Sequence, residues 1–198
     1  MVSVAYIVLP FLVFIICVFL AALVLNSNWR SHTNRVFAVF LVAMALWGLT
    51  IFGMRSSPSP SESNLAYQWE KWVFGAIVAT SILFFHFTLL FTRTRFSRWV
   101  LRALYALGAM VWGLSLGGVV VTGMQEKFYG HAPVLGPAFL VYLVVAYVPI
   151  VSALVVLARS LRRSRSNDEK NRIAYVLLGA LASFIGGTTD FLPALGLN

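Results

Sequence analysis

The sequence predicts an all-α protein, a polytopic bundle of six helices that span a membrane. Three observations carry this prediction. First, the 198 residues are 60% apolar and only 11% charged, whereas soluble domains usually carry about 25% charged residues. Second, the apolar residues gather into six stretches, each close to the roughly 20 residues that a spanning helix needs. Third, most of the 15 lysines and arginines lie in short segments between these stretches.

The expected helices follow the apolar stretches in order. They cover approximately residues 6–25, 36–54, 69–91, 104–121, 135–158 and 167–190. The last has a recognisable start, because Ser166 followed by Glu169 fits the S-x-x-E capping box that satisfies free N–H groups in a first helical turn. Its end is marked by Gly186-Gly187 and Pro193, which favour a kink or a break. We expect one membrane domain over residues 1–198.

The basic residues predict an orientation. They concentrate in three loops, 30–35, 93–102 and 159–172, and the two loops that alternate with these hold only Arg55, Lys71 and Lys127. Short loops rich in lysine and arginine remain in the cytoplasm, because moving them across the membrane is disfavoured. We therefore expect the N-terminus outside and the three basic loops inside, in contact with anionic lipid head groups.

Composition and motifs exclude several classes. The net charge of +9 is confined to membrane-flanking loops rather than to a basic face on a polar domain, so no nucleic-acid partner is expected. A lone cysteine, Cys17, allows no internal disulfide and no cysteine-based metal site. The chain has no G-x-x-x-x-G-K-[ST] phosphate loop and no H-E-x-x-H zinc motif. We expect no enzyme activity in this chain, no metal and no cofactor.

Polar side chains at the outer ends of the spans are candidate binding residues, because polar groups in a membrane are costly and tend to be functional. Asp190 either lines an outward-facing pocket or ends its helix paired with Lys71, Arg55 or water. Trp69, Glu70 and Trp72 form either an aromatic and charged rim for a ligand or an interfacial aromatic belt with a Glu70–Arg55 ion pair.

His86, at the inner part of the third stretch, has two possible roles. Its imidazole titrates near neutral pH, so it is a candidate proton-sensitive or ligand-contacting group. The alternative is an interhelical hydrogen bond that stabilises packing. No second histidine is expected within a span.

Two stripes of small residues recur at every fourth position. One comprises Ala109, Gly113 and Gly117, and the other comprises Gly179, Ser183 and Gly187. Such stripes allow helices to approach closely. We expect them to pack inside the bundle, with homodimerisation as the alternative.

Several short runs, in a shared order, resemble one known family. They are Asn34-Arg35-Val36-Phe37, Trp47-Gly48, Trp69-Glu70-Lys71-Trp72, Phe85-His86-Phe87-Thr88-Leu89-Leu90-Phe91-Thr92, Tyr129-Gly130, Gly136-Pro137, Arg162-Arg163, Glu169-Lys170-Asn171-Arg172, Tyr175-Val176-Leu177-Leu178-Gly179, Gly186-Gly187 and Thr189-Asp190-Phe191-Leu192-Pro193. The chain resembles the seven-transmembrane N-terminal sensor region of bacterial histidine kinases, which also precedes diguanylate cyclases. The resemblance implies a bacterial inner-membrane receptor, a seventh helix after Asn198, and a cytoplasmic kinase or cyclase module beyond it.

These observations together predict a membrane-embedded signal-sensing domain. It would perceive an extracellular or membrane-dissolved small ligand and relay a helix rearrangement to the cytoplasm, with His86 as the coupling residue. We expect an outward cavity among the second, third, fifth and sixth stretches. The residues expected near it are Trp47, Arg55, Trp69, Glu70, Trp72, Tyr142 and Asp190. The alternatives are a small transporter or channel subunit and a structural subunit of a larger membrane complex.

Overall fold

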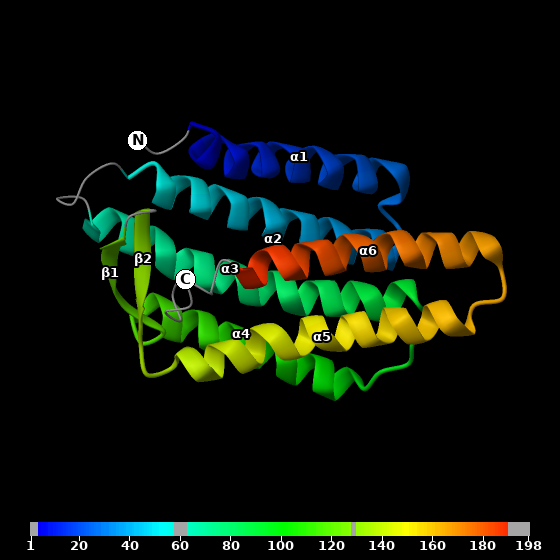
Figure 1. The fold of residues 1–198 in the computed structure, drawn as a ribbon. Coiled ribbons are helices and arrows are strands. Elements are labelled where there is room, and N and C mark those ends of the chain that lie inside the picture. The colour runs from blue at the N-terminus through cyan, green and yellow to red at the C-terminus, as the bar shows by residue number, and fades with distance from the viewer. Residues whose placement is uncertain (1–3, 58–62, 128–129, 190–198) are drawn as a thin grey trace.

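The computed structural model describes residues 4–57, 63–127 and 130–189. Six helices lie lengthwise beside one another, and a two-stranded hairpin covers one end of the bundle (Figure 1). The elements are α1 (Val4–Asn28), α2 (His32–Arg55), α3 (Ser63–Phe91), α4 (Arg98–Leu116), β1 (Val121–Lys127), β2 (Gly130–Leu135), α5 (Phe139–Arg163) and α6 (Asn167–Thr189). The predicted all-α membrane bundle of six helices is confirmed.

Five of the helices, α1 to α5, are long and apolar enough to cross a membrane. Helix α6 does not meet the same test within the described residues. Its first turns carry Asp168, Glu169, Lys170 and Arg172, so its apolar part is shorter than the helix. Its apolar part nevertheless runs alongside α5 within the bundle.

The start of α6 agrees with the prediction, but the capping detail differs. The Lys170 N–H donates to the Ser166 carbonyl at 3.0 Å, as in a first helical turn. Glu169, however, accepts a hydrogen bond from the Ser164 hydroxyl at 2.6 Å. The carboxylate therefore ties the preceding loop to the helix.

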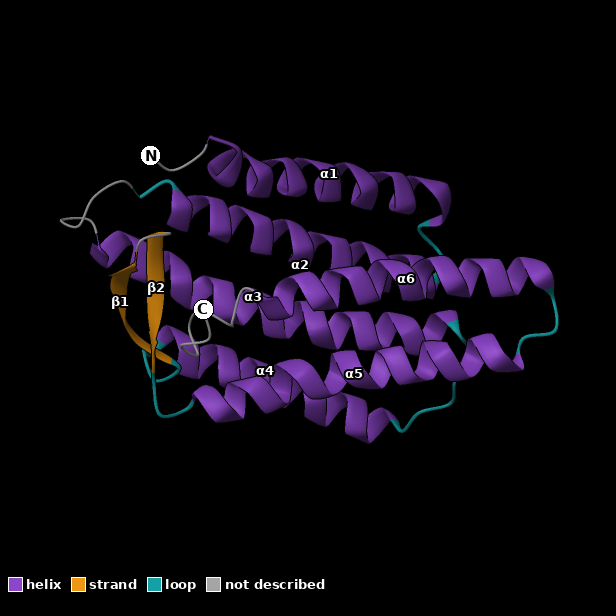
Figure 2. Cartoon of the chain, in the orientation of Figure 1, coloured by secondary structure: helices purple, strands orange, loops and turns teal. Residues whose placement is uncertain are grey.

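The hairpin was missed by the sequence prediction, which placed helix up to residue 121 and again from residue 135. Helix α4 ends at Leu116, and the chain then turns at Gly118, whose φ of 75° suits glycine. β-Branched residues follow and favour a strand. β1 and β2 pair antiparallel, with Val121 opposite Leu135 (Figure 2). The Tyr67 hydroxyl donates to the Val121 carbonyl at 3.1 Å and fastens the hairpin to α3.

Helix α3 is the centre of the bundle. It contacts α2, α4, α5 and the hairpin, and most of its apolar window is buried. One apolar cluster, which includes Phe74 and Tyr142, occupies the half nearer the hairpin, and a second, which includes Phe85 and Leu157, occupies the other half. Helix α1 packs mainly against α2 and leaves its outer face exposed, with Phe19 at 62% exposure. This apolar exposure is expected of a surface that faces lipid.

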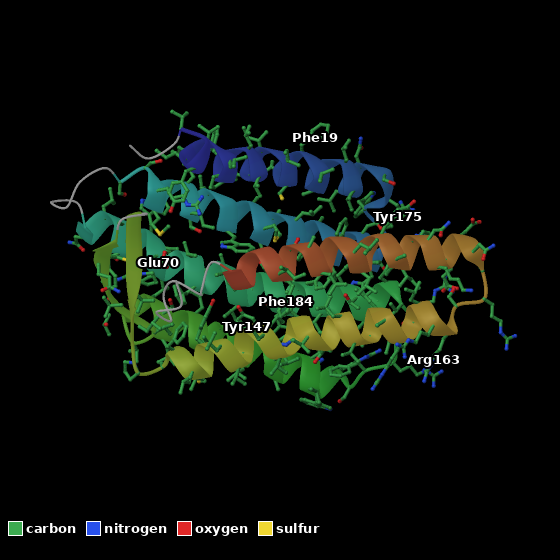
Figure 3. The ribbon with its side chains drawn as sticks, in the orientation of Figure 1. Phe19, Glu70, Tyr147, Arg163, Tyr175 and Phe184 are labelled. Carbon is green, nitrogen blue, oxygen red and sulfur yellow. The ribbon has the colours of Figure 1, made fainter. Side chains whose placement is uncertain are left out.

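The three basic loops lie at one end of the bundle and the hairpin at the other. The α1–α2, α3–α4 and α5–α6 connections are together at the end marked by Arg163, whereas Glu70 lies toward the hairpin end (Figure 3). Consecutive helices alternate in direction, so the charge segregation seen along the sequence becomes a segregation between the two ends of the molecule. The two ends are called below the basic end and the hairpin end.

Candidate functional site

A cavity of about 380 Å³ lies among α2, α3, α5 and α6, with Cys17 of α1 also on its wall. It is lined mostly by apolar and aromatic side chains. The aromatic lining residues are Phe37, Phe40, Trp47, Phe84, Phe87, Tyr147, Tyr175 and Phe184. No Lys, Arg, Asp, Glu or His occurs among the described residues of its wall. These properties are typical of a small-molecule site, and here the site would accept a neutral, mainly apolar molecule.

Aromatic pairs between α2 and α3 close the part of the cavity nearer the basic end. Phe37 stacks on Phe87 with ring centroids 4.6 Å apart, and Phe40 lies 5.5 Å from Phe84. These pairs set the antiparallel register of the two helices. The same register places Met44 of α2 beside Thr80 of α3, one turn nearer the hairpin end. Trp47 follows Met44 by about one further turn of α2, so Thr80 and Trp47 are about one turn apart along the helix axes.

Two side chains of this wall carry polar atoms that are buried and have no hydrogen-bond partner within the described part of the chain. These atoms are Nε1 of Trp47 and Oγ1 of Thr80. Neighbouring Ser81, by contrast, donates its hydroxyl to the Ile77 carbonyl at 2.9 Å. Buried polar groups in proteins are nearly always paired, and an unpaired one calls for an explanation.

The small-residue stripe of α6 forms one side of the cavity. Gly179, Ser183 and Gly187 all lie on its wall. A methyl group added at Gly179 would meet no described atom within 4 Å, and one added at Gly187 would lie 3.9 Å from the Trp47 ring. The expectation that this stripe packs closely against another helix was therefore wrong. Small side chains here leave space instead of filling it.

The stripe of α4 also differs from the expectation of packing inside the bundle. Ala109, Gly113 and Gly117 are exposed, whereas the buried face of α4 carries Gly108, Val111 and Ser115. The same run, residues 113–117, fits the G-x-S-x-G pattern of serine hydrolases. In hydrolases that serine is exposed on a strand-to-helix turn. Ser115 instead lies in the last turn of a helix, fully buried, and donates to the Lys71 carbonyl at 2.9 Å, so the pattern has a packing role.

Of the residues predicted for the site, Trp47 is on the cavity wall. Arg55, Glu70 and Tyr142 lie nearer the hairpin end and form what we call the outer polar cluster. The charge of Arg55 acts on the Glu70 carboxyl, and that carboxyl acts on Tyr142. Glu70 is only 5% exposed and Tyr142 is fully buried. Nε of Arg55, Oε2 of Glu70 and the Tyr142 hydroxyl have no hydrogen-bond partner among the described residues.

Arg55 also joins α2 to α1. Its Nη1 donates to the Tyr6 carbonyl at 2.9 Å, and its guanidinium lies 3.8 Å from the centre of the Tyr6 ring. A cation this close to an aromatic face is attracted by the ring electrons. The same side chain thus contacts α1 and acts electrostatically on α3.

Trp69 and Trp72, the other two tryptophans predicted for the site, pack against neighbouring helices. The Trp69 ring lies over Gly53 of α2, where an added Cβ would be 2.5 Å from it. Trp72 is 46% exposed and makes an edge-to-face contact with Trp112 of α4, with centroids 5.8 Å apart. Neither is on the cavity wall as described. Asp190 lies outside the described residues.

His86 makes an interhelical hydrogen bond, which was the alternative considered for it. Its Nδ1 is 2.9 Å from the Tyr105 hydroxyl of α4. Its ring also contacts that of His32, the first residue of α2, at a centroid distance of 5.9 Å. A second histidine therefore lies nearby although it was not expected within a span. His86 joins α2, α3 and α4 near the basic end.

An apolar helical bundle with its basic loops collected at one end defines a multi-pass membrane protein. The chain belongs to a known family, because the family model described as the N-terminal 7TM region of histidine kinase matches residues 9–198. It is therefore a membrane-embedded sensor region of the histidine-kinase type. The search of curated proteins and the search of solved structures found no match.

Proposed function

We propose that this domain binds a neutral, mainly apolar small molecule in the cavity among α2, α3, α5 and α6, and that occupancy is relayed to a cytoplasmic kinase module. The observation that carries the proposal is the cavity itself. It combines about 380 Å³ of mostly apolar space with two unpaired buried polar atoms, those of Trp47 and Thr80. A sensor region needs a place where a signal can act, and these features support this one.

The composition of the wall favours a ligand that dissolves in the membrane. Charged side chains are absent from the described lining, so an ionic ligand would be left without partners there. Tyr175 of α6 lies on the wall and is 75% exposed. The main neighbour of α6 in the bundle is α5. A molecule from the lipid phase could therefore reach the cavity beside α6.

The relay would follow from differential binding. A ligand shifts a helix bundle only if it binds one arrangement more tightly than the other. The cavity wall draws on five helices, so a ligand that bridges α2 and α6 would favour the arrangement that brings them together. The His32–His86–Tyr105 contacts tie α2, α3 and α4 at the basic end, where a cytoplasmic module would receive the change. We propose His86 as the coupling residue.

Photolabelling with benzophenone tests the binding step. When excited, its carbonyl takes a hydrogen atom from a nearby C–H bond and the two carbon radicals then join, so the probe marks the residues around it. We expect purified chain in lipid nanodiscs to be labelled on cavity-lining segments of α2, α3 and α6. Labelling of the exposed outer face of α1, around Phe19, provides an internal reference for probe dissolved in lipid.

A matched pair of variants makes this test specific. Gly179→Leu places a side chain in the open space of the cavity, and Gly113→Leu places the same side chain on the exposed face of α4, where an added Cβ also meets nothing within 4 Å. We expect the ratio of cavity labelling to α1 labelling to fall at least about fivefold in Gly179→Leu and to remain unchanged in Gly113→Leu. Equal ratios in the wild type and both variants would exclude a binding cavity.

The relay is tested separately in the full-length receptor. We expect Gly179→Leu to abolish the response of kinase autophosphorylation to an added lipid-soluble extract that activates the wild type. Gly113→Leu should keep this response. His86→Phe should keep benzophenone labelling of the cavity but lose the response. If His86→Phe responds like the wild type, His86 serves packing alone.

A further inference from the structure

We infer that the ligand of this cavity is a flat conjugated ring that bears a carbonyl group, the chemistry of a lipid-soluble quinone or aromatic ketone. This inference rests on the proposed binding function and specifies the class of molecule. Three observations carry it: the types of the unpaired polar atoms, the helix register of the two residues that bear them, and the distribution of rings around the cavity.

The unpaired atoms define the polar part of the ligand. The indole Nε1–H of Trp47 can only donate a hydrogen bond, so its partner must be an acceptor. The Thr80 side chain is 8% exposed, and its hydroxyl can also donate. A carbonyl oxygen has two lone pairs and can accept from both donors at once. With no charged residue on the described wall, a neutral acceptor suits the site and a carboxylate or phosphate does not.

The positions of the two donors suit a single polar group. The register of α2 against α3, set by the Phe37–Phe87 and Phe40–Phe84 contacts, places Thr80 about one helical turn from Trp47. One turn of an α-helix rises about 5.4 Å. A small ring is about as long as this spacing of the two residues along the helix axes, so both side chains can turn toward one carbonyl-bearing molecule.

The shape of the wall favours a ring for the apolar part. Phe40 and Phe84 offer aromatic faces and edges on one side, and Tyr147 and Phe184 meet edge-on, with centroids 5.7 Å apart, on the other. Aromatic rings prefer offset-stacked and edge-to-face neighbours. The stripe that includes Gly179 and Ser183 has no bulky side chain, so a flat molecule can lie against α6.

Competition against benzophenone labelling tests the class with matched compounds. The competitors are 2,3-dimethyl-1,4-naphthoquinone, 2,3-dimethylnaphthalene, which has nearly the same shape without the oxygens, and 2-undecanone, which has a carbonyl without a ring. Labelling of the outer face of α1 corrects for light absorbed by the competitor. We expect the quinone to halve cavity labelling at a concentration at least about tenfold lower than either other compound, about the effect of one well-placed hydrogen bond to a buried donor.

The variants Trp47→Phe and Thr80→Val remove one donor each. Thr80→Val keeps the side-chain volume, and Trp47→Phe keeps an aromatic ring but is smaller. We expect each to reduce the advantage of the quinone over the naphthalene to about twofold, without changing competition by the naphthalene. If the quinone and the naphthalene compete equally in the wild type, the cavity binds apolar molecules without a carbonyl requirement, and this inference fails while the proposed function stands. If 2-undecanone equals the quinone, the ring is not recognised. If no compound competes although cavity labelling falls in Gly179→Leu, this inference fails and the proposed function stands. If cavity labelling does not depend on Gly179, both proposals fail.

Discussion

At the scale of single residues, glycines set how closely the helices approach. A Cβ added at Gly48 of α2 would lie 2.8 Å from the Pro10 carbonyl oxygen and 3.2 Å from the Phe14 nitrogen of α1. These are backbone atoms, which cannot move aside without moving the helix. Gly113 of α4, by contrast, is exposed and would meet nothing within 4 Å. Glycine therefore permits a close contact between helices at position 48 of α2, and it has no such role at position 113 of α4.

This contrast predicts opposite effects of one substitution. We expect Gly48→Ala to destabilise the protein by about 1–3 kcal/mol, because overpacking pushes α1 away from α2. Gly113→Ala should leave stability unchanged or raise it by up to about 1 kcal/mol, since alanine favours a helix more than glycine does. Thermal unfolding in detergent measures both. Equal losses in the two variants would contradict the close α1–α2 contact.

The outer polar cluster predicts coupling between two residues. Removing the Arg55 charge leaves the buried Glu70 carboxyl without the cation that stabilises its charged form, although the two groups form no direct ion pair. We expect Arg55→Met to cost clearly more in the wild type than in a Glu70→Gln background, with a coupling energy of at least about 1 kcal/mol. Arg55→Met loses the contact with Tyr6 in both backgrounds, so the comparison between the backgrounds removes this contribution. Strictly additive effects would show that the two groups act independently.

At the scale of elements, α3 and α4 are joined at both ends by polar contacts. Near the hairpin end Ser115 donates to the Lys71 carbonyl at 2.9 Å, and near the basic end His86 meets the Tyr105 hydroxyl at 2.9 Å. Hydrogen bonds between membrane helices average about 0.6 kcal/mol, with values up to about 1.7 kcal/mol. The two contacts therefore contribute little to the stability of the α3–α4 pair and mainly determine the orientation of α4. The apolar residues between them provide most of the packing.

Tyr105→Phe isolates the contact at the basic end, because it removes one oxygen and keeps the ring that packs edge-on against His86. We expect a loss of stability below about 2 kcal/mol and a changed basal kinase activity in the full-length receptor. Ser115→Ala is the matched control, since it removes an α3–α4 hydrogen bond of the same length at the other end. If the two variants change basal activity equally, the basic end has no special role in coupling.

At the scale of the whole molecule, the segregation of charge predicts the orientation in the membrane. The basic loops meet at one end and the hairpin lies at the other. Because basic loops are retained in the cytoplasm, we propose that the hairpin and the outer polar cluster face outward. The cavity then lies between the two ends, within reach of the lipid phase.

Cysteine labelling tests this orientation. In a Cys17→Ser background, single cysteines are introduced as Thr122→Cys in the hairpin and Ser166→Cys in the α5–α6 connection, both at exposed positions. We expect a membrane-impermeant maleimide to label the first in intact spheroplasts and the second only after lysis. The reverse pattern would overturn the proposed orientation.

What the sequence alone determined follows from local and additive properties. Apolar stretches about as long as a membrane-spanning helix, and charges concentrated in three loops, were sufficient to predict six helices, their order and the collection of basic loops at one end. Short-range signals at Ser166 placed the start of α6 correctly. The hairpin was not predicted because the valines at 119–121, which lead into β1, continue an apolar stretch, and apolarity alone does not separate a short strand from the end of a helix.

Only the tertiary structure decided what each side chain faces. The stripes on α4 and α6 have the same spacing, yet one is exposed and the other lines a cavity, because a neighbouring helix determines which surface is covered. Likewise, Trp47 was expected near the cavity, but Thr80 is ordinary in sequence and becomes a candidate ligand donor only because the antiparallel register of α2 and α3 brings it close to Trp47. Contacts between residues distant along the chain depend on the packing of whole helices, and no local pattern specifies that packing.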